Sequence, residues 1–169
     1  ELYRRPIESG QSPALLATLR RRIRPRTLPR TKDEVARDLP PQIEQVLSDR
    51  LWRPLGMEHD GYMQVDTSGA PLVSGGLNLR LRDLARFCDM MRQGGRFNGR
   101  QIVPAAVVAD IAGGASPEDF VKAGYKTLPG WSYHNQWWVS HNDDGAYSAR
   151  GVYGQACYVD PKAEMSIVR

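Results

Sequence analysis

The chain is poor in the residues that build metal centres and disulfide frameworks. Its 169 residues include only two cysteines and three histidines. His59, His134 and His141 show no His-x-x-x-His spacing, and no acidic residue is placed to complete a zinc pattern. We therefore expect no metal and no cofactor, and we expect the histidines at the surface or in loops. Cys88 and Cys157 are predicted to be buried free thiols, which is compatible with the cytoplasmic location that we expect.

Long apolar runs are missing as well. The longest, such as residues 105–109, fall far short of the roughly 20 residues that a membrane-spanning helix needs. No apolar stretch follows Glu1-Leu-Tyr-Arg-Arg5, so the start does not resemble a signal peptide. Hydrophobic residues make up 41% of the chain and charged residues 25%, which is typical of a globular domain with a sizeable core. We expect no membrane partner.

The excess of positive charge is confined to the beginning of the chain. Residues 1–30 hold eight arginines against two glutamates, a local net charge of +6, so the rest of the chain carries −2 of the total of +4. Residues 20–30 mix arginine with helix-breaking prolines and show no apolar period. We interpret residues 1–41 as a poorly ordered or non-native segment, and a reading-frame shift near residues 30–42 would produce it. The alternative, a basic arm for nucleic acid, is disfavoured because no aromatic residues interleave the arginines.

Apolar periodicity predicts several helices after this segment. Residues 43–51 carry apolar side chains, including Val46, at helical spacing. A second amphipathic helix, over residues 81–91, is expected to stop at Gly94-Gly95. Ser116-Pro-Glu-Asp119 combines a cap residue, a proline at the first helical position and an acidic residue, which opens a short helix.

The end of the chain has the period of β-strands. Three β-rich runs cover residues 136–140, 149–159 and 165–169. The turns between them are short, which implies antiparallel neighbours. Helices followed by an antiparallel sheet predict an α+β fold. Trp137 and Trp138 alternate faces of their strand, which leaves open that one packs in the core and the other lines a cleft, but a core position is favoured for both.

Four sequence blocks follow one another along residues 51–155. They are Leu51-Trp-Arg-Pro-Leu-Gly-Met-Glu-His-Asp60, Ser74-Gly-Gly-Leu-Asn-Leu-Arg-Leu-Arg-Asp-Leu-Ala-Arg-Phe87, Asn135-Gln-Trp-Trp-Val139 and Gly151-Val-Tyr-Gly-Gln155. Together they resemble the C-terminal half of the serine β-lactamase-like hydrolases, and most of all the 6-aminohexanoate-dimer hydrolases and neighbouring esterases. The resemblance implies a partial β-lactamase/transpeptidase-like fold over residues 42–169. Its antiparallel strands would have flanking helices but would lack the N-terminal part and the C-terminal helix.

The resemblance also implies a chemistry of which this chain holds only a part. In the family, the serine of a Ser-x-x-Lys motif attacks an amide or ester carbonyl and forms an acyl-enzyme. Neither Ser-x-x-Lys nor Gly-x-Ser-x-Gly occurs in the 169 residues. Tyr133-His-Asn135 imitates the family's Tyr-x-Asn motif but follows the first block instead of preceding it, so we interpret it as a chance match. We therefore predict that the chain lacks the nucleophile and is inactive alone.

By resemblance, the last block has a backbone role in catalysis. We predict that Gly151-Val-Tyr-Gly-Gln155 is a strand that stands where β-lactamases carry Lys-Thr-Gly. The backbone N–H of Gln155 would then point at the developing oxyanion. Tyr153 and Gly154 would border the substrate. The simpler alternative is a plain core strand whose glycines accommodate a packed neighbour.

The glycine loop before residue 77 borders the substrate cleft in the family, and it also serves as a tight connection. The residues concerned are Ser74, Gly75 and Gly76. One departure from the family pattern follows this loop. Arg80 stands where the family commonly has Thr or Ser, so Asp83 loses its capping partner and Asn78 is expected to cap the helix instead.

Three functions remain open at this point. The favoured one is a fragment of a serine hydrolase that acts on a small amide or ester. The second is a non-catalytic relative that serves as a ligand-binding or interaction module. The third, nucleic-acid binding through residues 1–30, is disfavoured. Apolar surface left uncovered by the absent elements is also expected to promote self-association.

Overall fold

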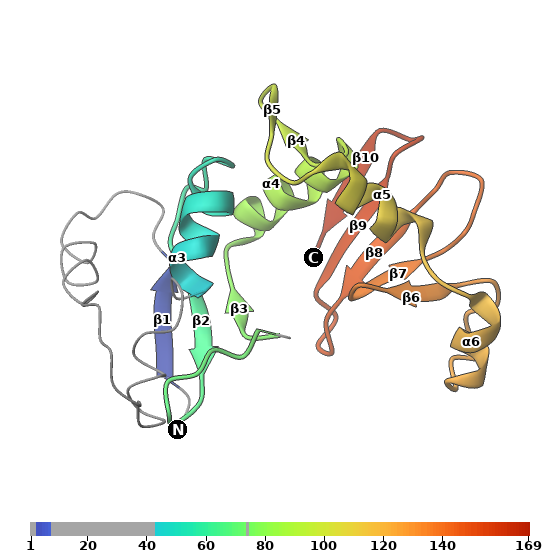
Figure 1. Cartoon of the computed structure of the whole chain (residues 1–169), viewed down its shortest axis with the longest axis horizontal. Coiled ribbons are helices and arrows are strands. Elements are labelled where there is room, and N and C mark those ends of the chain that lie inside the picture. Colours follow the sequence, from blue (N-terminus) through green and yellow to red (C-terminus); the bar gives the residue numbers. More distant parts are fainter. Residues whose placement is uncertain (1–2, 8–42, 74) are drawn as a thin grey trace, which may run out of the picture. The chain divides into compact units, whose positions relative to one another are not determined.

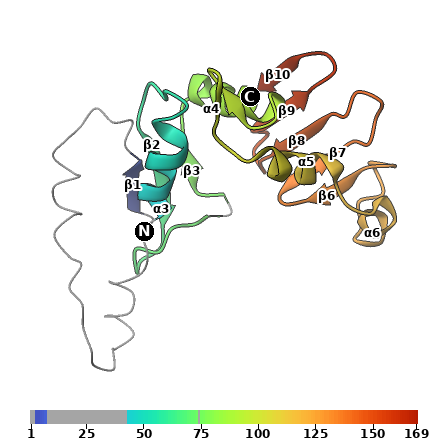
Figure 2. The ribbon, with the colours of Figure 1, turned by 45° about the horizontal axis from the view of Figure 1, so that its top comes forward.

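The computed structural model describes residues 3–7, 43–73 and 75–169 (Figure 1; Figure 2). The chain divides into two compact units, residues 1–79 and residues 80–169. Each unit has antiparallel strands, and helices accompany them, so the predicted α+β class is confirmed. In the part of the chain that is described, no helix is long and apolar enough to cross a membrane.

The first unit is built on a three-stranded antiparallel sheet in the order β1-β2-β3. Its elements are β1 (Tyr3–Ile7), α3 (Ile43–Leu47), the π-helical segment η1 (Ser48–Trp52), β2 (Gly61–Val65) and β3 (Leu77–Asn78). After β2 the chain turns at Asp66, whose side chain accepts hydrogen bonds from the N–H groups of Ser68 and Ala70 at 2.9 and 2.8 Å. A 2.7 Å hydrogen bond from the Ser68 hydroxyl, followed by the bond from the Ala70 N–H, lowers the pKa of the Asp66 carboxyl, and together these bonds fix the turn predicted between residues 63 and 73.

The helix predicted over residues 43–51 forms, but it buries a different face. The buried residues are spaced four apart: Glu44, Ser48 and Trp52. Val46, expected on the apolar face, is 36% exposed. The indole of Trp52 explains the difference. The ring packs so closely on Gly61 that a Cβ added there would meet it at 2.5 Å. The Nε1 of the same indole donates to the His59 carbonyl at 2.9 Å.

The second unit is a five-stranded antiparallel sheet in the order β10-β9-β8-β7-β6, with α4 packed on β9 and β10 (Figure 1). A small hairpin of β4 and β5 and the helices α5 and α6 complete it. The elements are α4 (Leu81–Arg92), β4 (Arg96–Phe97), β5 (Arg100–Gln101), α5 (Ala105–Gly113), α6 (Pro117–Lys122), β6 (Ser132–His134), β7 (Trp137–Val139), β8 (Tyr147–Arg150), β9 (Ala156–Asp160) and β10 (Met165–Val168).

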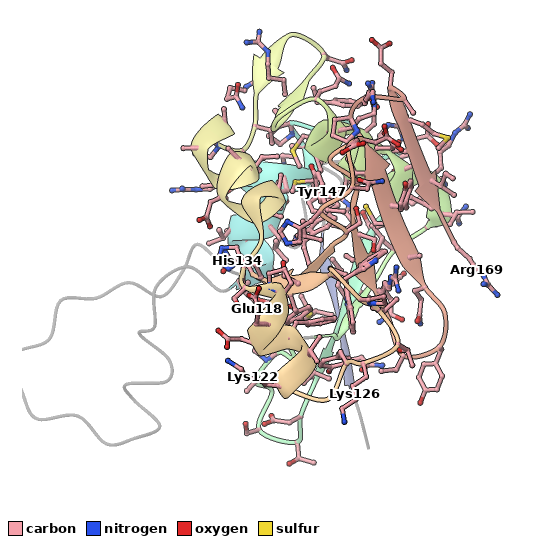
Figure 3. The ribbon with its side chains drawn as sticks, turned by 90° about the vertical axis from the view of Figure 1, so that its right-hand side faces the viewer. Glu118, Lys122, Lys126, His134, Tyr147 and Arg169 are labelled. Carbon is pink, nitrogen blue, oxygen red and sulfur yellow. The ribbon has the colours of Figure 1, made fainter. Side chains whose placement is uncertain are left out.

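Two helix ends lie where the sequence predicts them. Gly94 and Gly95 have φ of 63° and 84°, and their N–H groups donate to Met91 and Met90 and close α4. At the start of α6, the Ser116 hydroxyl accepts from the Asp119 N–H at 3.1 Å. Hydrogen bonds from its own N–H and from Ser116 lower the pKa of Glu118, which lies at the surface of this helix (Figure 3).

The start of α4 lacks a side-chain cap. Arg80 occupies the N-cap position with extended backbone, and its side chain makes no capping hydrogen bond. The prediction that Asn78 would cap the helix is wrong, because Asn78 lies in β3 and its amide donates to the Gly76 carbonyl at 2.9 Å. Asp83 is fully buried and pairs with Arg86 at 3.3 Å.

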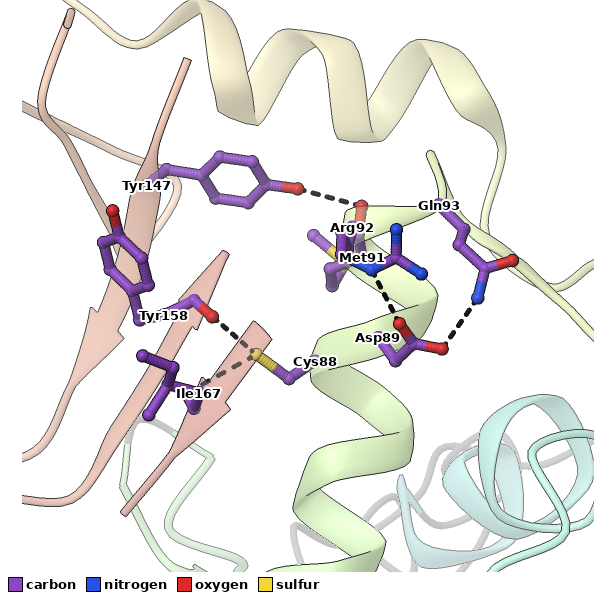
Figure 4. Close-up of polar contacts among 8 residues, drawn as sticks. All are labelled: Cys88, Asp89, Met91, Arg92, Gln93, Tyr147, Tyr158 and Ile167. Atoms are coloured by element: carbon purple, nitrogen blue, oxygen red, sulfur yellow. Dashed lines mark hydrogen bonds and ion pairs between the residues drawn. The ribbon is translucent and has the colours of Figure 1, made fainter. Parts of the chain in front are cut away.

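The core of the second unit centres on Tyr147, the buried first residue of β8. Its hydroxyl donates to the backbone carbonyl of Met91 at 2.9 Å (Figure 4). Its ring lies 5.2 Å from that of Trp137, which in turn stacks on Phe87. Burial raises the pKa of Tyr147 well above its usual value.

We expect Tyr147→Phe to lower the free energy of unfolding by about 0.5–1.5 kcal/mol, because one buried hydrogen bond is lost while the Met91 carbonyl keeps the Gly94 N–H as a donor. Urea denaturation measures this loss. Tyr158→Phe is the matched control, because that hydroxyl makes only a 3.3 Å bond to Asp160 near the surface. Equal losses in the two variants would contradict the role given to the buried bond.

The stability of the Tyr147→Phe variant should also depend on pH in a different way from that of the unmodified chain. The pKa of Tyr147 is higher in the folded than in the unfolded chain, so this contribution to stability is complete below about pH 10 and is lost as the pH rises above it. Tyr147→Phe should therefore lose less stability between neutral and alkaline pH than the unmodified chain does.

Arg80→Thr should raise the free energy of unfolding by about 1 kcal/mol, because threonine would cap α4 and complete a capping box with Asp83. Thermal denaturation followed by circular dichroism gives the measurement. Arg80→Ala removes the arginine without adding a cap and serves as control. A gain of the same size in Arg80→Ala would show that the cap is not its cause.

Candidate functional site

The segment predicted as one strand over residues 149–159 is instead a hairpin. β8 ends at Arg150, β9 begins at Ala156, and the two strands are antiparallel. Residues 151–155 join them, and we call this segment the oxyanion loop after the role that the resemblance predicts for it. Gly154 has φ of 86°, a conformation that side chains rarely allow, and this reversal ends the strand.

Two hydrogen bonds close the oxyanion loop across its base. The Gly151 N–H donates to the Gln155 carbonyl at 2.8 Å, and the Gly154 N–H donates to the Gly151 carbonyl at 3.1 Å. The Gln155 side-chain oxygen accepts from the Tyr153 N–H at 3.1 Å. A Cβ on Gly151 would collide with that side chain, so both glycines are needed for this geometry.

The loop presents its residues to solvent. Val152 is 93% exposed and Tyr153 is 90% exposed. Among the described residues, the backbone N–H of Gln155 finds no hydrogen-bond partner, although its carbonyl and side chain both have one. The Val152 N–H has no partner among the described residues either, so this loop has two N–H groups beside an exposed aromatic ring that can offer hydrogen bonds to a ligand.

The structure brings only part of the predicted site together. Tyr153, Gly154 and Gln155 share the oxyanion loop, whereas Gly75 and Gly76 belong to the first unit. Ser74 lies outside the described residues. The N–H of Gly76 donates to the Leu72 carbonyl at 2.7 Å, and a Cβ on Gly76 would meet that oxygen at 2.5 Å, so this glycine is required by the turn itself.

Two histidines of the second unit bind neighbouring side chains. His134 Nε2 lies 3.0 Å from a carboxylate oxygen of Asp110, and the Asn135 amide donates to the same oxygen (Figure 3). His141 Nε2 lies 2.7 Å from the Ser132 hydroxyl, which also accepts the Ala115 N–H. Ser132 is fully buried, so its hydroxyl ties His141 to the Ala115 backbone and is not accessible to a substrate.

The Tyr133-His-Asn135 sequence has a structural explanation. Asn135 and Gln136 form the two-residue turn between β6 and β7, and both have positive φ, as a type I′ turn requires. β6 itself was not predicted from the sequence. Three residues are too few to give a period, and the preceding Gly130-Trp131 reads as a loop.

Sequence reasoning also missed an aromatic cluster on the outer face of the sheet. Trp137 is buried, but Trp138 faces away from the core, so the core position expected for both is wrong for Trp138. The rings around Trp138, at centroid distances of 5.2–5.6 Å, are Phe120, Tyr125 and Tyr133. The guanidinium of Arg150 lies 5.6 Å above Trp138 and 4.6 Å above Trp131.

The two cysteines are free and buried, as predicted. Cys88, on α4, points its sulfur at the Tyr158 carbonyl at 3.2 Å (Figure 4). A hydrogen bond with Cys88, together with burial, raises the pKa of the Cys157 thiol. Cys157 is therefore not a ready nucleophile. The hydrogen bond with Cys157 lowers the pKa of the Cys88 thiol, but Cys88 is fully buried, so a ligand cannot reach it. Among the described residues, no three His, Cys, Asp or Glu side chains lie together in a way that could hold a metal ion.

Comparison with known proteins gives this geometry a family context. No protein-family model matches the chain. A solved Bacteroides dorei structure, named as a β-lactamase, covers 74% of the chain and 43% of its own length with a TM-score of 0.52. At 22% identity, it shows a β-lactamase-like fold and no more. The chain therefore has a β-lactamase-like fold, as its four sequence blocks predict.

Two relatives with higher sequence identity are both named 6-aminohexanoate-dimer hydrolases. The 6-aminohexanoate-dimer hydrolase of Paenarthrobacter ureafaciens is 34% identical over 126 residues, which are 74% of this chain and 32% of the relative. A solved Bacillus anthracis structure, named as a 6-aminohexanoate-dimer hydrolase, is 38% identical, with a TM-score of 0.66 over 76% of this chain and 32% of its own. The chain therefore spans about a third of the length of these relatives.

Gly154→Ala should lower the free energy of unfolding by about 1–2 kcal/mol, because alanine strains the positive φ although space is available for its Cβ. Chemical denaturation measures the change. Gly113→Ala, at the end of α5 with open space and no positive φ, is the control and should cost nothing. Equal changes in the free energy of unfolding for the two variants would show that the positive φ of Gly154 is not the cause of the loss.

Proposed function

We propose that this chain supplies the oxyanion loop of a serine hydrolase that cleaves small amides or esters through an acyl-serine intermediate. The observation that carries the proposal is the Gln155 N–H, which has no hydrogen-bond partner among the described residues and lies in an exposed loop. The name of the curated relative supports the substrate class, because a dimer of 6-aminohexanoate is joined by an amide bond.

The proposed chemistry needs a donor of this kind. A serine hydroxyl would attack the carbonyl carbon and pass its proton to the lysine of Ser-x-x-Lys, the carbonyl oxygen would become an oxyanion, and the Gln155 N–H would donate to it. Collapse of this intermediate would break the bond to the leaving group, which takes up that proton and departs as the amine or alcohol, and water would then hydrolyse the acyl-serine. A backbone donor fixed before the reaction costs no reorganisation, and loss of one such donor typically removes about 2.7–4 kcal/mol of transition-state stabilisation.

Other residues would also contact the substrate. Tyr153, exposed next to the loop, would contact the substrate beside the reacting carbonyl. Gly75 and Gly76 would border the cleft through backbone, and Ser74 is assigned by resemblance alone. Since the 169 residues contain no Ser-x-x-Lys, the nucleophile and its lysine would come from sequence beyond them.

A second candidate function is a non-catalytic interaction module. Its support is β10, an edge of the sheet among the described strands, on which Met165 is 41% exposed and Ile167 is 51% exposed. Exposed apolar side chains on an edge strand favour pairing with another chain or with a second copy. This candidate predicts no contribution of Gln155 to any hydrolysis.

The test grafts residues 43–169 into the Paenarthrobacter enzyme in place of the corresponding third. We expect p-nitrophenyl butyrate to be hydrolysed by the chimera and not by this chain alone, with turnover abolished by a serine-directed sulfonyl fluoride. In the chimera, Gln155→Pro removes the N–H and should lower kcat by about 100- to 1000-fold. Gln155→Ala keeps the N–H and is the matched control.

Two outcomes would contradict the proposal. A chimera that unfolds cooperatively but shows no turnover would favour the interaction module. A chimera in which Gln155→Pro and Gln155→Ala are equally active would show that this N–H does not touch the oxyanion. Hydrolysis by the unmodified chain alone, blocked by the sulfonyl fluoride, would place the nucleophile inside it.

A further inference from the structure

Arg150 is held in a fixed position at the foot of the oxyanion loop. It is the last residue of β8, so the loop begins with the next residue, Gly151. Its Nε donates to the hydroxyl of Ser148 at 3.1 Å, and Ser148 is 2% exposed. Its guanidinium also lies over the rings of Trp131 and Trp138. The Nε edge of the guanidinium is thus hydrogen-bonded, and its plane is in contact with aromatic rings.

Within the described part of the chain, the remaining edge of this group has no hydrogen-bond or ion-pair partner. The hydrogen bond to Ser148 uses Nε, and among the described residues no carboxylate pairs with Arg150. A guanidinium stacked on aromatic rings keeps its planar fork of donors, and such a fork fits a carboxylate with two parallel hydrogen bonds. Since stacking and the Ser148 bond already fix the side chain, little conformational entropy is left to lose on binding.

The surface beside the fork is apolar. Tyr125 and Tyr133 are each 46% exposed, and both rings contact Trp138 edge-on. A charged fork at the end of an aromatic surface matches a ligand with an aliphatic chain and one terminal carboxylate. Single anions such as phosphate would use the charge but not the aromatic surface.

We propose that Arg150 binds the terminal carboxylate of an aliphatic substrate, with the chain of that substrate lying on the Trp138 cluster. This inference rests on the proposed function, because the neighbouring oxyanion loop would then receive the carbonyl of the same molecule. It assigns Arg150 a role in specificity for acidic amides or esters. The chemistry at the carbonyl does not involve Arg150.

The full chain and unreactive probes test the binding itself. Hexanoate carries both features, hexanamide lacks the charge, and inorganic phosphate lacks the chain. Titrations followed by the indole ¹H–¹⁵N signals of Trp131 and Trp138 should show hexanoate binding at least about tenfold more tightly than either hexanamide or phosphate. Equal affinity for hexanamide, or for phosphate, would overturn the proposal without any substitution in the protein.

Substitutions then assign the binding to one residue. Arg150→Gln should weaken hexanoate binding by about tenfold or more, and Arg150→Lys, which keeps the charge but loses the fork, should lie between. Arg100→Gln, an exposed arginine in β5, is the matched control and should change the affinity less than about twofold. An unchanged affinity in Arg150→Gln, with the Trp137 indole signal still in place, would also overturn it.

Kinetics of the chimera separate this inference from the proposed function. Arg150→Gln should raise KM for mono-p-nitrophenyl glutarate and leave p-nitrophenyl butyrate unaffected. If both esters are hydrolysed and neither responds to the substitution, the carboxylate role fails and the hydrolase function stands. If the chimera hydrolyses neither ester, the hydrolase function fails, and the hexanoate titration still decides whether Arg150 binds carboxylates.

Discussion

The alternation of side chains along β7 and β8 determines which of their residues form the core of the second unit and which lie on the opposite face of the sheet. Trp137 and Tyr147 point to the face covered by α4 and form the core, with the hydroxyl of Tyr147 tied to the Met91 carbonyl. Trp138 and Ser148, one residue further on each strand, are paired on the opposite face. A shift of one residue in this register would exchange the core and the outer face. The position of Arg150 over Trp138 depends on the same register.

The turn after β8 is a second constraint, set by two glycines for different reasons. Gly151 has no room for a side chain because Gln155 folds back against it. Gly154 has space, but its φ of 86° is costly for any other residue. Together they allow a five-residue reversal between two core strands. This reversal ties the Gln155 carbonyl into the hairpin and leaves its N–H unused within the described residues.

Local signals in the sequence predicted local structure well. The double glycine that ends α4 and the serine cap of α6 depend only on neighbours within a turn, and both are found. The hairpin at residues 151–155 was missed because the valines and tyrosines within and around it favour strands, and glycine also occurs in strands. The Arg150–Trp131 contact could not be predicted, because it depends on the pairing of β6, β7 and β8, which no short sequence window contains.

The misassigned strand bears directly on the chemistry. β8 has neighbours on both sides, β7 and β9, so the N–H groups along it have backbone partners within reach in the sheet. A backbone donor for an oxyanion must be unpaired in the resting protein, otherwise the reaction would have to break a ladder hydrogen bond to use it. The first place where that condition is met is beyond the last paired residues, Arg150 and Ala156. An oxyanion donor at Gln155 is therefore more consistent with a loop at the end of β8 than with the continuous strand that the sequence suggests.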